Sequence, residues 1–157
     1  MRRLAALFLA LSSIPVAAAE LSFGLGAVGL DDGAQAGGIA VELRAEPFRR
    51  FGATELGFGG AVELDTDSDI WIGAGLVVIR PFAESWRVEA SVMPGVYTQG
   101  SGLDLGSVIE FRSLIGVSRR VASETWLGVS ISHKSNASID DTNPGEETIM
   151  LHLTRRF

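Results

Sequence analysis

Apolar and polar residues alternate with a period of two along most of this chain, in eight segments separated by clusters of Gly, Asp, Asn, Pro and Ser. Such alternation is typical of β-strands that have one apolar and one polar face. The segments cover residues 21–30, 36–46, 54–65, 70–80, 87–98, 107–119, 125–136 and 147–157. The sequence therefore predicts an all-β protein.

One parity is apolar in every segment, as in Leu127, Val129 and Ile131 of the seventh. The other parity carries Gly, Ser and charges of both signs, among them Glu42, Arg44, Glu55, Glu63, Glu89, Glu110, Arg112, Lys134 and Arg156. A soluble β-sandwich would alternate in the same way. Alternation alone therefore does not distinguish a sandwich from a membrane barrel, and other features of the sequence are needed.

Four features favour the barrel. They are an export signal, an even number of strands, apolar patterning in every strand, and lengths near the ~9–11 residues with which a tilted strand crosses a bilayer. We therefore expect an eight-stranded antiparallel transmembrane β-barrel of the bacterial outer membrane. The lumen of eight strands is just wide enough for side chains to fill it. The inward charges are accordingly predicted to form a paired core and not to line a channel.

The first 19 residues have the pattern of a secretory signal peptide. Arg2 and Arg3 precede an apolar run at 4–11, and alanines at 17–19 form a small-residue cleavage site. We expect cleavage before Glu20, which leaves residues 20–157 as one barrel domain. The apolar run is too short to span a bilayer as a helix. Cysteine is absent, and the net charge of -6 argues against a nucleic-acid partner.

The two ends of the predicted barrel differ in charge. If both chain ends are periplasmic, the external loops hold Asp31, Asp32, Asp65, Asp67, Asp69, Asp104, Asp140 and Asp141, and the inner turns hold Arg49, Arg50, Arg119 and Arg120. We interpret the acidic residues as solvated turns in preference to a rim that shares divalent cations with lipid phosphates. The Asp65 to Asp69 run imitates a calcium loop, but Ile70 and Leu76 occupy its glycine and bidentate-glutamate positions.

Three polar residues interrupt the apolar parity near the C-terminus. His133 and Ser135 continue the lipid-facing row of the seventh segment, and Glu147 begins that of the eighth. Polar groups are costly on a lipid-facing surface unless they have a function. A hairpin between the two segments would place Glu147 beside His133 or Ser135. Alternatively, the three residues only mark the polar edge where the strands leave the membrane.

These residue types suit nucleophilic catalysis of acyl transfer. Histidine can take the proton of a serine hydroxyl, and a carboxylate orients the imidazole and stabilises the imidazolium that forms. Asn136 follows the serine and could donate a hydrogen bond to the developing oxyanion, more easily from its backbone than from its inward side chain. Catalysis of this kind needs no metal or cofactor, and we expect none.

The run His133-Lys134-Ser135-Asn136-Ala137, with Asn143-Pro144-Gly145 and then Glu147 twelve positions after the serine, resembles the signature of the PagL-type lipid A 3-O-deacylases. The resemblance implies an eight-stranded outer-membrane barrel. It also implies an esterase that removes the 3-hydroxyacyl chain at position 3 of lipid A in lipopolysaccharide. His133 would be the base, Ser135 the nucleophile, Glu147 the orienting carboxylate and Asn136 an oxyanion contributor. Glu146 is not chosen because its parity is inward.

The expected partners are thus lipid A and the lipids of the outer membrane. An apolar row lies beneath the three polar residues, so acyl chains could lie along it while the ester sits at head-group depth. Two other functions stay open at this point: a non-enzymatic barrel that strengthens the envelope or binds a partner, and a phospholipase with the same triad. The sequence does not decide whether two barrels associate as a homodimer.

Overall fold

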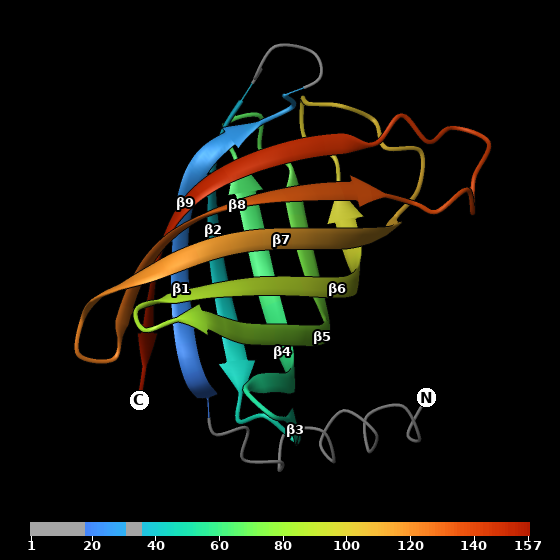
Figure 1. Ribbon diagram of the computed structural model, residues 1–157. Helices are drawn as coiled ribbons and strands as arrows, with labels where there is room; N and C mark the ends of the chain where they lie inside the picture. Colours follow the sequence, from blue (N-terminus) through green and yellow to red (C-terminus); the bar gives the residue numbers. More distant parts are fainter. Residues whose placement is uncertain (1–17, 31–35) are drawn as a thin grey trace, which may run out of the picture.

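The strands of this computed structural model, which describes residues 18–30 and 36–157, form one antiparallel barrel (Figure 1). Its long strands are β1 (Ala18–Val28), β2 (Ala36–Ala45), β4 (Thr54–Asp65), β5 (Ile70–Ala83), β6 (Trp86–Thr98), β7 (Ile109–Ala122), β8 (Thr125–Ser135) and β9 (Glu146–Arg156). Neighbours in sequence pair with one another, and β1 also pairs with β9. The sheet is therefore closed, and the prediction of an eight-stranded antiparallel barrel is confirmed.

One further strand, β3 (Arg49–Phe51), pairs with the start of β4 inside the β2–β4 connection. The sequence did not predict it, because three residues are too few to show alternation. The predicted signal peptide covers residues 1–19; residues 1–17 lie outside the described residues, and Ala18 and Ala19 begin β1. Two of the external-loop aspartates, Asp31 and Asp32, also lie outside the described residues. None of the residues that the structure describes form a helix with the length and hydropathy of a membrane span.

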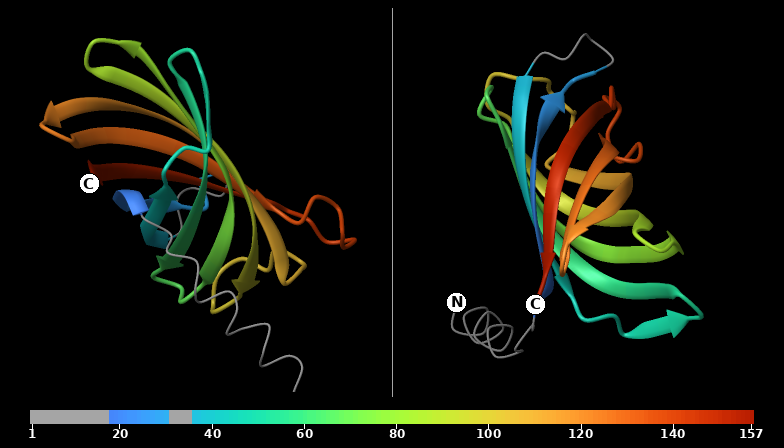
Figure 2. Two further views of the ribbon diagram at one scale, coloured as in Figure 1. Left: turned by 90° about the horizontal axis from the view of Figure 1, so that it is seen from below. Right: turned by 60° about the vertical axis from the view of Figure 1, so that its left-hand side comes forward.

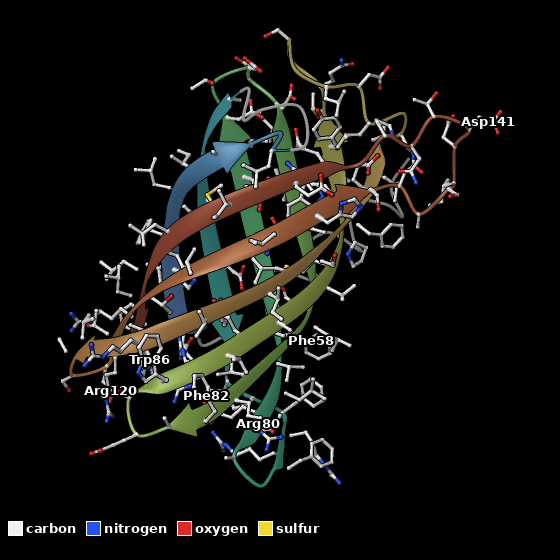
Figure 3. All side chains as sticks on the ribbon, turned by 45° about the horizontal axis from the view of Figure 1, so that its top comes forward. Phe58, Arg80, Phe82, Trp86, Arg120 and Asp141 are labelled. Atoms are coloured by element: carbon white, nitrogen blue, oxygen red, sulfur yellow. The ribbon has the colours of Figure 1, made fainter. Side chains whose placement is uncertain are left out.

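The apolar parity faces outward on all sides of the barrel. Leu25 is 67% exposed and Ile115 66% exposed, although both are large aliphatic side chains. Such a surface is unfavourable in water and suits a bilayer. Figure 3 shows Phe82 and Trp86 near Arg80 and Arg120 at one end of the barrel. Aromatic and basic residues together at one end are typical of a membrane interface.

Charged side chains on the inner face pair with one another across the lumen. Arg44 contacts Glu42 and Glu89, each at 2.8 Å. Arg112 bridges Glu42 at 2.8 Å and Glu63 at 2.7 Å. Arg44 and Glu42 are both on β2, but the other three pairs join β2 to β6, β7 to β2 and β7 to β4, so they link the walls of the barrel. The predicted paired core is confirmed for these residues, whereas both carboxylate oxygens of Glu110 lack a partner among the described residues.

An apolar cluster fills the part of the lumen that these ion pairs leave. It consists of Ala61, Trp71, Val77, Ile79, Met93, Tyr97 and Leu105. Trp71 is 1% exposed, and a Cβ at Gly73 or Gly95 would come within 2.6 Å of its ring. These two glycines therefore make room for the indole. Along β5 and β6 the inward parity thus also holds large apolar side chains, besides the Gly, Ser and charged residues noted in the sequence.

The loops gather at one end of the barrel, which we call the loop end, and the tight turns and the C-terminus lie at the other (Figure 1). The connection between β8 and β9, residues 136–145, projects beyond the barrel wall (Figures 1 and 2). Asp69 lies at this end but is only 3% exposed and accepts a hydrogen bond from Tyr97 Oη at 2.6 Å. The interpretation of the rim aspartates as solvated turn residues is therefore wrong for Asp69.

Replacing Arg112 by leucine tests the ion-paired core. We expect a loss of about 3–5 kcal/mol in the free energy of unfolding, because Glu42 and Glu63 each lose a cation partner inside the barrel. Urea unfolding in detergent micelles, followed by tryptophan fluorescence, measures it. The control is Arg50→Leu, whose side chain is 59% exposed in its pair with Glu55 and should cost less than about 1 kcal/mol. Equal losses in the two variants would contradict the interpretation.

Candidate active site

His133 and Glu147 stand directly opposite one another on β8 and β9. Their outward side chains are 44% and 37% exposed, and His133 Nδ1 lies 2.8 Å from Glu147 Oε1. A carboxylate can only accept a hydrogen bond, so Nδ1 carries the proton in this pair. Nε2 is then free to act as a base. The hairpin thus brings together two of the predicted site residues.

Ser135 is the last residue of β8 and lies on the same outward face as His133. Residues two apart on one face of a strand are separated by ~7 Å along it. In the part of the chain that the structure describes, no hydrogen bond joins Ser135 to His133. Catalytic hydrogen bonds are often long without substrate and tighten only when it binds. Ser135 is therefore a neighbour of the histidine on the same face, without a hydrogen bond to it among the described residues.

A second serine flanks the histidine from the other side. Ser113 on β7 is the cross-strand partner of His133, so Glu147, His133 and Ser113 form a row across three strands. Directly opposed residues on one face have Cβ atoms ≈ 4.5–5.5 Å apart. The sequence analysis missed Ser113 because parity within one strand says nothing about its register against the next. Two serines, Ser113 and Ser135, thus lie next to His133 on the outward face.

Asn136 fastens two loops at the loop end and is 0% exposed. Its side-chain amide donates to Leu105 O at 3.0 Å and to Thr142 O at 2.7 Å. Its backbone N–H donates to Asn143 Oδ1 at 3.0 Å. All of its N–H groups are therefore engaged, and a backbone role at an oxyanion would require the N–H to exchange the Asn143 carbonyl for substrate.

Backbone contacts fix both sides of the His133–Glu147 pair. The carbonyl of Glu147 accepts hydrogen bonds from the N–H groups of Gly29 at 2.9 Å and Leu30 at 3.1 Å, just after β1. Gly145 has a φ of +76° and packs against the imidazole, so that a Cβ there would lie 2.6 Å from His133 Cε1. A glycine at 145 therefore serves both the turn and the space that the ring occupies.

An open apolar groove with a volume of about 410 Å³ runs over the outer surface next to the pair. It is lined by Val88, Ile115, Gly116, Val117, Val129, Ser130, Ile131 and Ile149. Ile131 and Ile149 are the residues that come next on the same outward faces of β8 and β9, below His133 and Glu147. The groove thus lies one row of outward residues below the polar pair, over the strands that face lipid. Its β6 and β7 residues were not among those predicted for the site.

Replacing Gly145 by alanine tests whether this contact positions the histidine. We expect labelling of the folded chain by a serine-reactive fluorophosphonate to slow by about 10²-fold, because a small displacement of a catalytic group has effects of this size. The matched control is Gly52→Ala. Gly52 also has a positive φ, of +59°, but a Cβ there meets no other atom within 4 Å. Equal labelling rates in the two variants would show that Gly145 does not position His133.

Comparison with known proteins bears on both the sequence and the fold. The model of the family "Lipid A 3-O-deacylase (PagL)" matches residues 41–156. The lipid A deacylase PagL of Bordetella bronchiseptica is 29% identical over 91 residues, which cover 56% of this chain and 51% of that protein. The chain thus spans about half the length of this curated relative.

Two solved structures are similar in fold. The crystal structure of the outer membrane enzyme PagL matches with a TM-score of 0.76 and 19% identity, over 88% of this chain and 100% of that one. The Yersinia pestis outer membrane protein Ail matches with a TM-score of 0.52 and 13% identity, over 88% and 99%. At these identities, the likeness shows a shared barrel fold.

The matched segment extends from β2 to β9 and includes His133, Ser135 and Glu147. The family and the outer-membrane barrel fold indicate that the chain resides in the bacterial outer membrane. Since the family model covers most of the barrel, the chain belongs to the lipid A 3-O-deacylase (PagL) family.

Proposed function

We propose that this chain is an outer-membrane esterase that removes the 3-hydroxyacyl chain from position 3 of lipid A. The observation that carries the proposal is the His133–Glu147 pair, with 2.8 Å between Nδ1 and Oε1, on the outward face of the barrel. An imidazole held by a carboxylate is the arrangement that activates a serine. Its position at the border of an apolar surface suits an ester that is anchored by acyl chains.

In the proposed reaction, Ser135 is the nucleophile. Its Oγ attacks the ester carbonyl carbon while His133 Nε2 takes the hydroxyl proton. Glu147 holds the Nδ1 proton and stabilises the imidazolium. The intermediate collapses by breaking the bond between the carbonyl carbon and the sugar oxygen, which takes the proton from His133. Water then attacks the acyl-serine with His133 again as base, which releases a 3-hydroxy fatty acid and restores Ser135.

Asn136 is our proposed contributor to oxyanion stabilisation, through its backbone N–H. That N–H now donates to the side-chain carbonyl of Asn143 at 3.0 Å. A substrate oxyanion carries more negative charge than an amide carbonyl and would accept a stronger hydrogen bond from the same donor. Loss of one such donor elsewhere costs about 3–4 kcal/mol of transition-state stabilisation. The buried side chain would meanwhile keep the two loops in place.

The apolar groove supports a lipid substrate in preference to a soluble ester. The side chains of Ile131 and Ile149 line the groove between the polar pair and the middle of the barrel wall. An acyl chain in this groove would remain in the apolar layer while its ester reaches Ser135 at the depth of the head groups. A soluble ester would gain nothing from a groove that opens toward lipid.

Mass spectrometry of lipid A from cells expressing the chain tests the proposal, with Ser135→Ala and Ser113→Ala compared side by side. We expect the wild type and Ser113→Ala to remove one 3-hydroxyacyl group, and Ser135→Ala to lower that activity by more than about 10³-fold. The reverse result would move the nucleophile to Ser113. Unchanged lipid A together with accumulating lysophospholipids would favour a phospholipase instead, and no change in either lipid class would remove the enzymatic assignment.

A bulky side chain in the groove tests where the acyl chain lies. Val117→Trp should reduce release of long 3-hydroxyacyl chains more than that of short ones, because the indole fills space that only the longer chains reach. The control is Val78→Trp on β5, which is also outward-facing and 37% exposed but lies outside the groove. An unchanged chain-length profile in Val117→Trp would place the acyl chain elsewhere.

A further inference from the structure

The loop end of the lumen, behind the His133–Glu147 pair, carries an excess of buried negative charge. Glu63, Asp69, Glu110 and Glu146 are each at most 5% exposed, and Asp65 is half-buried beside them. These carboxylates come from β4, β7 and β9 and from the loop between β4 and β5. Buried carboxylates are costly unless a cation pairs with them or they take up a proton.

Three of these carboxylates lie close enough to share one ion. Asp65, Asp69 and Glu146 each offer an oxygen, and the three oxygens lie within 4.8 Å of one another. Backbone N–H groups of Asp67 and Asp69 hold Asp65 Oδ1, at 2.9 and 3.0 Å. Tyr97 Oη donates to Asp69 at 2.6 Å. The fold therefore fixes the cluster before any ligand arrives.

The cations at this end are already used by other groups. Lys134 Nζ lies 2.7 Å from Glu146 Oε2 and 3.3 Å from Glu63 Oε2. Arg112 is shared between Glu63 and Glu42. Among the described residues, no lysine or arginine forms an ion pair with Asp65, Asp69 or Glu110.

A second observation also indicates a missing ligand. Glu110 is 0% exposed, and neither of its carboxylate oxygens has a hydrogen-bond partner. This carboxylate belongs to the inward row of β7, two residues before Arg112, which stands opposite Lys134; Lys134 in turn stands opposite Glu146. Asn136, one strand away, is also 0% exposed and leaves its Oδ1 without a partner. Buried oxygens of this kind are rare unless a water or an ion satisfies them.

We propose that the loop end of the lumen binds one calcium ion, with Asp65, Asp69 and Glu146 as its protein ligands. Calcium takes six to eight oxygens at 2.3–2.6 Å in irregular geometry, so two of its ligands can be about 5 Å apart, which fits the span of this cluster. Magnesium demands a smaller and regular octahedron. Pairing of Glu146 Oε2 with Lys134 leaves Oε1 for the ion, and water completes the shell.

The calcium ion would have a structural role and would take no part in ester cleavage. Glu146 precedes Glu147 on β9, and Lys134 follows His133 on β8. The ion would therefore tie the outer ends of the two strands that carry the pair to the end of β4 and the β4–β5 loop across the lumen. We expect a dissociation constant in the range of extracellular calcium modules, about 10⁻⁴–10⁻³ M. The reason is that only the three carboxylates are charged ligands and water supplies the rest of the shell.

Calcium titration of the mature chain in detergent micelles, after removal of metals with a chelator, tests the site. We expect a saturable rise in melting temperature by circular dichroism. We also expect terbium luminescence on excitation of the aromatic residues, since Tyr97 contacts Asp69 directly, and its displacement by calcium. Asp69→Asn and Glu146→Gln should each weaken calcium binding by at least roughly tenfold, since each removes one of three charged ligands.

The matched control is the double variant Asp140→Asn, Asp141→Asn, which removes two exposed carboxylates from the β8–β9 loop and should bind calcium as the wild type does. Circular dichroism in the chelator checks that each variant is folded. A wild type whose melting temperature does not respond up to about 10 mM calcium would overturn the proposal, because that exceeds the expected range. An effect that persists in both lumen variants would also overturn it, since the ion would then bind elsewhere.

Discussion

Closure of the sheet by pairing of β1 with β9 is the constraint on which the rest of this structure depends. No water is available in a bilayer to satisfy an open strand edge, so each backbone N–H and C=O must find a partner in the next strand. Once the ring is closed, the period of two decides for every residue whether it meets lipid or the lumen. That division explains how a chain without cysteine can present apolar residues outward and bury many charges.

The site belongs to the outer surface and not to the interior. His133 and Glu147 are part of the same outward rows as Ile131 and Ile149. They are the polar residues at the end of rows that are otherwise apolar. The barrel therefore presents a polar edge between an apolar layer and the loops. A pocket inside the lumen would serve a lipid poorly, since ion pairs and the Trp71 cluster fill it.

Much of this could be predicted from the sequence because alternation is a local signal. It gave the strands, the two faces and the convergence of His133 and Glu147. Other features depend on contacts between distant segments: Ser113 is opposite His133 only through the β7–β8 register, and Trp71 is buried only because two glycines leave it room. The hydrogen bonds of Asn136 to two loops could not be predicted either, because loop sequences have no periodic pattern that indicates their conformation.

The hydrogen bonds from Gly29 and Leu30 to the Glu147 carbonyl affect when the site forms during assembly of the barrel. The first strand of the barrel anchors a residue on the last, so the pair is held on both sides only after the seam between them has closed. A precursor in transit, with its ends still apart, would carry the residues of the site without their final support. The His133–Glu147 pair would thus gain its final support only when the ring closes in the membrane.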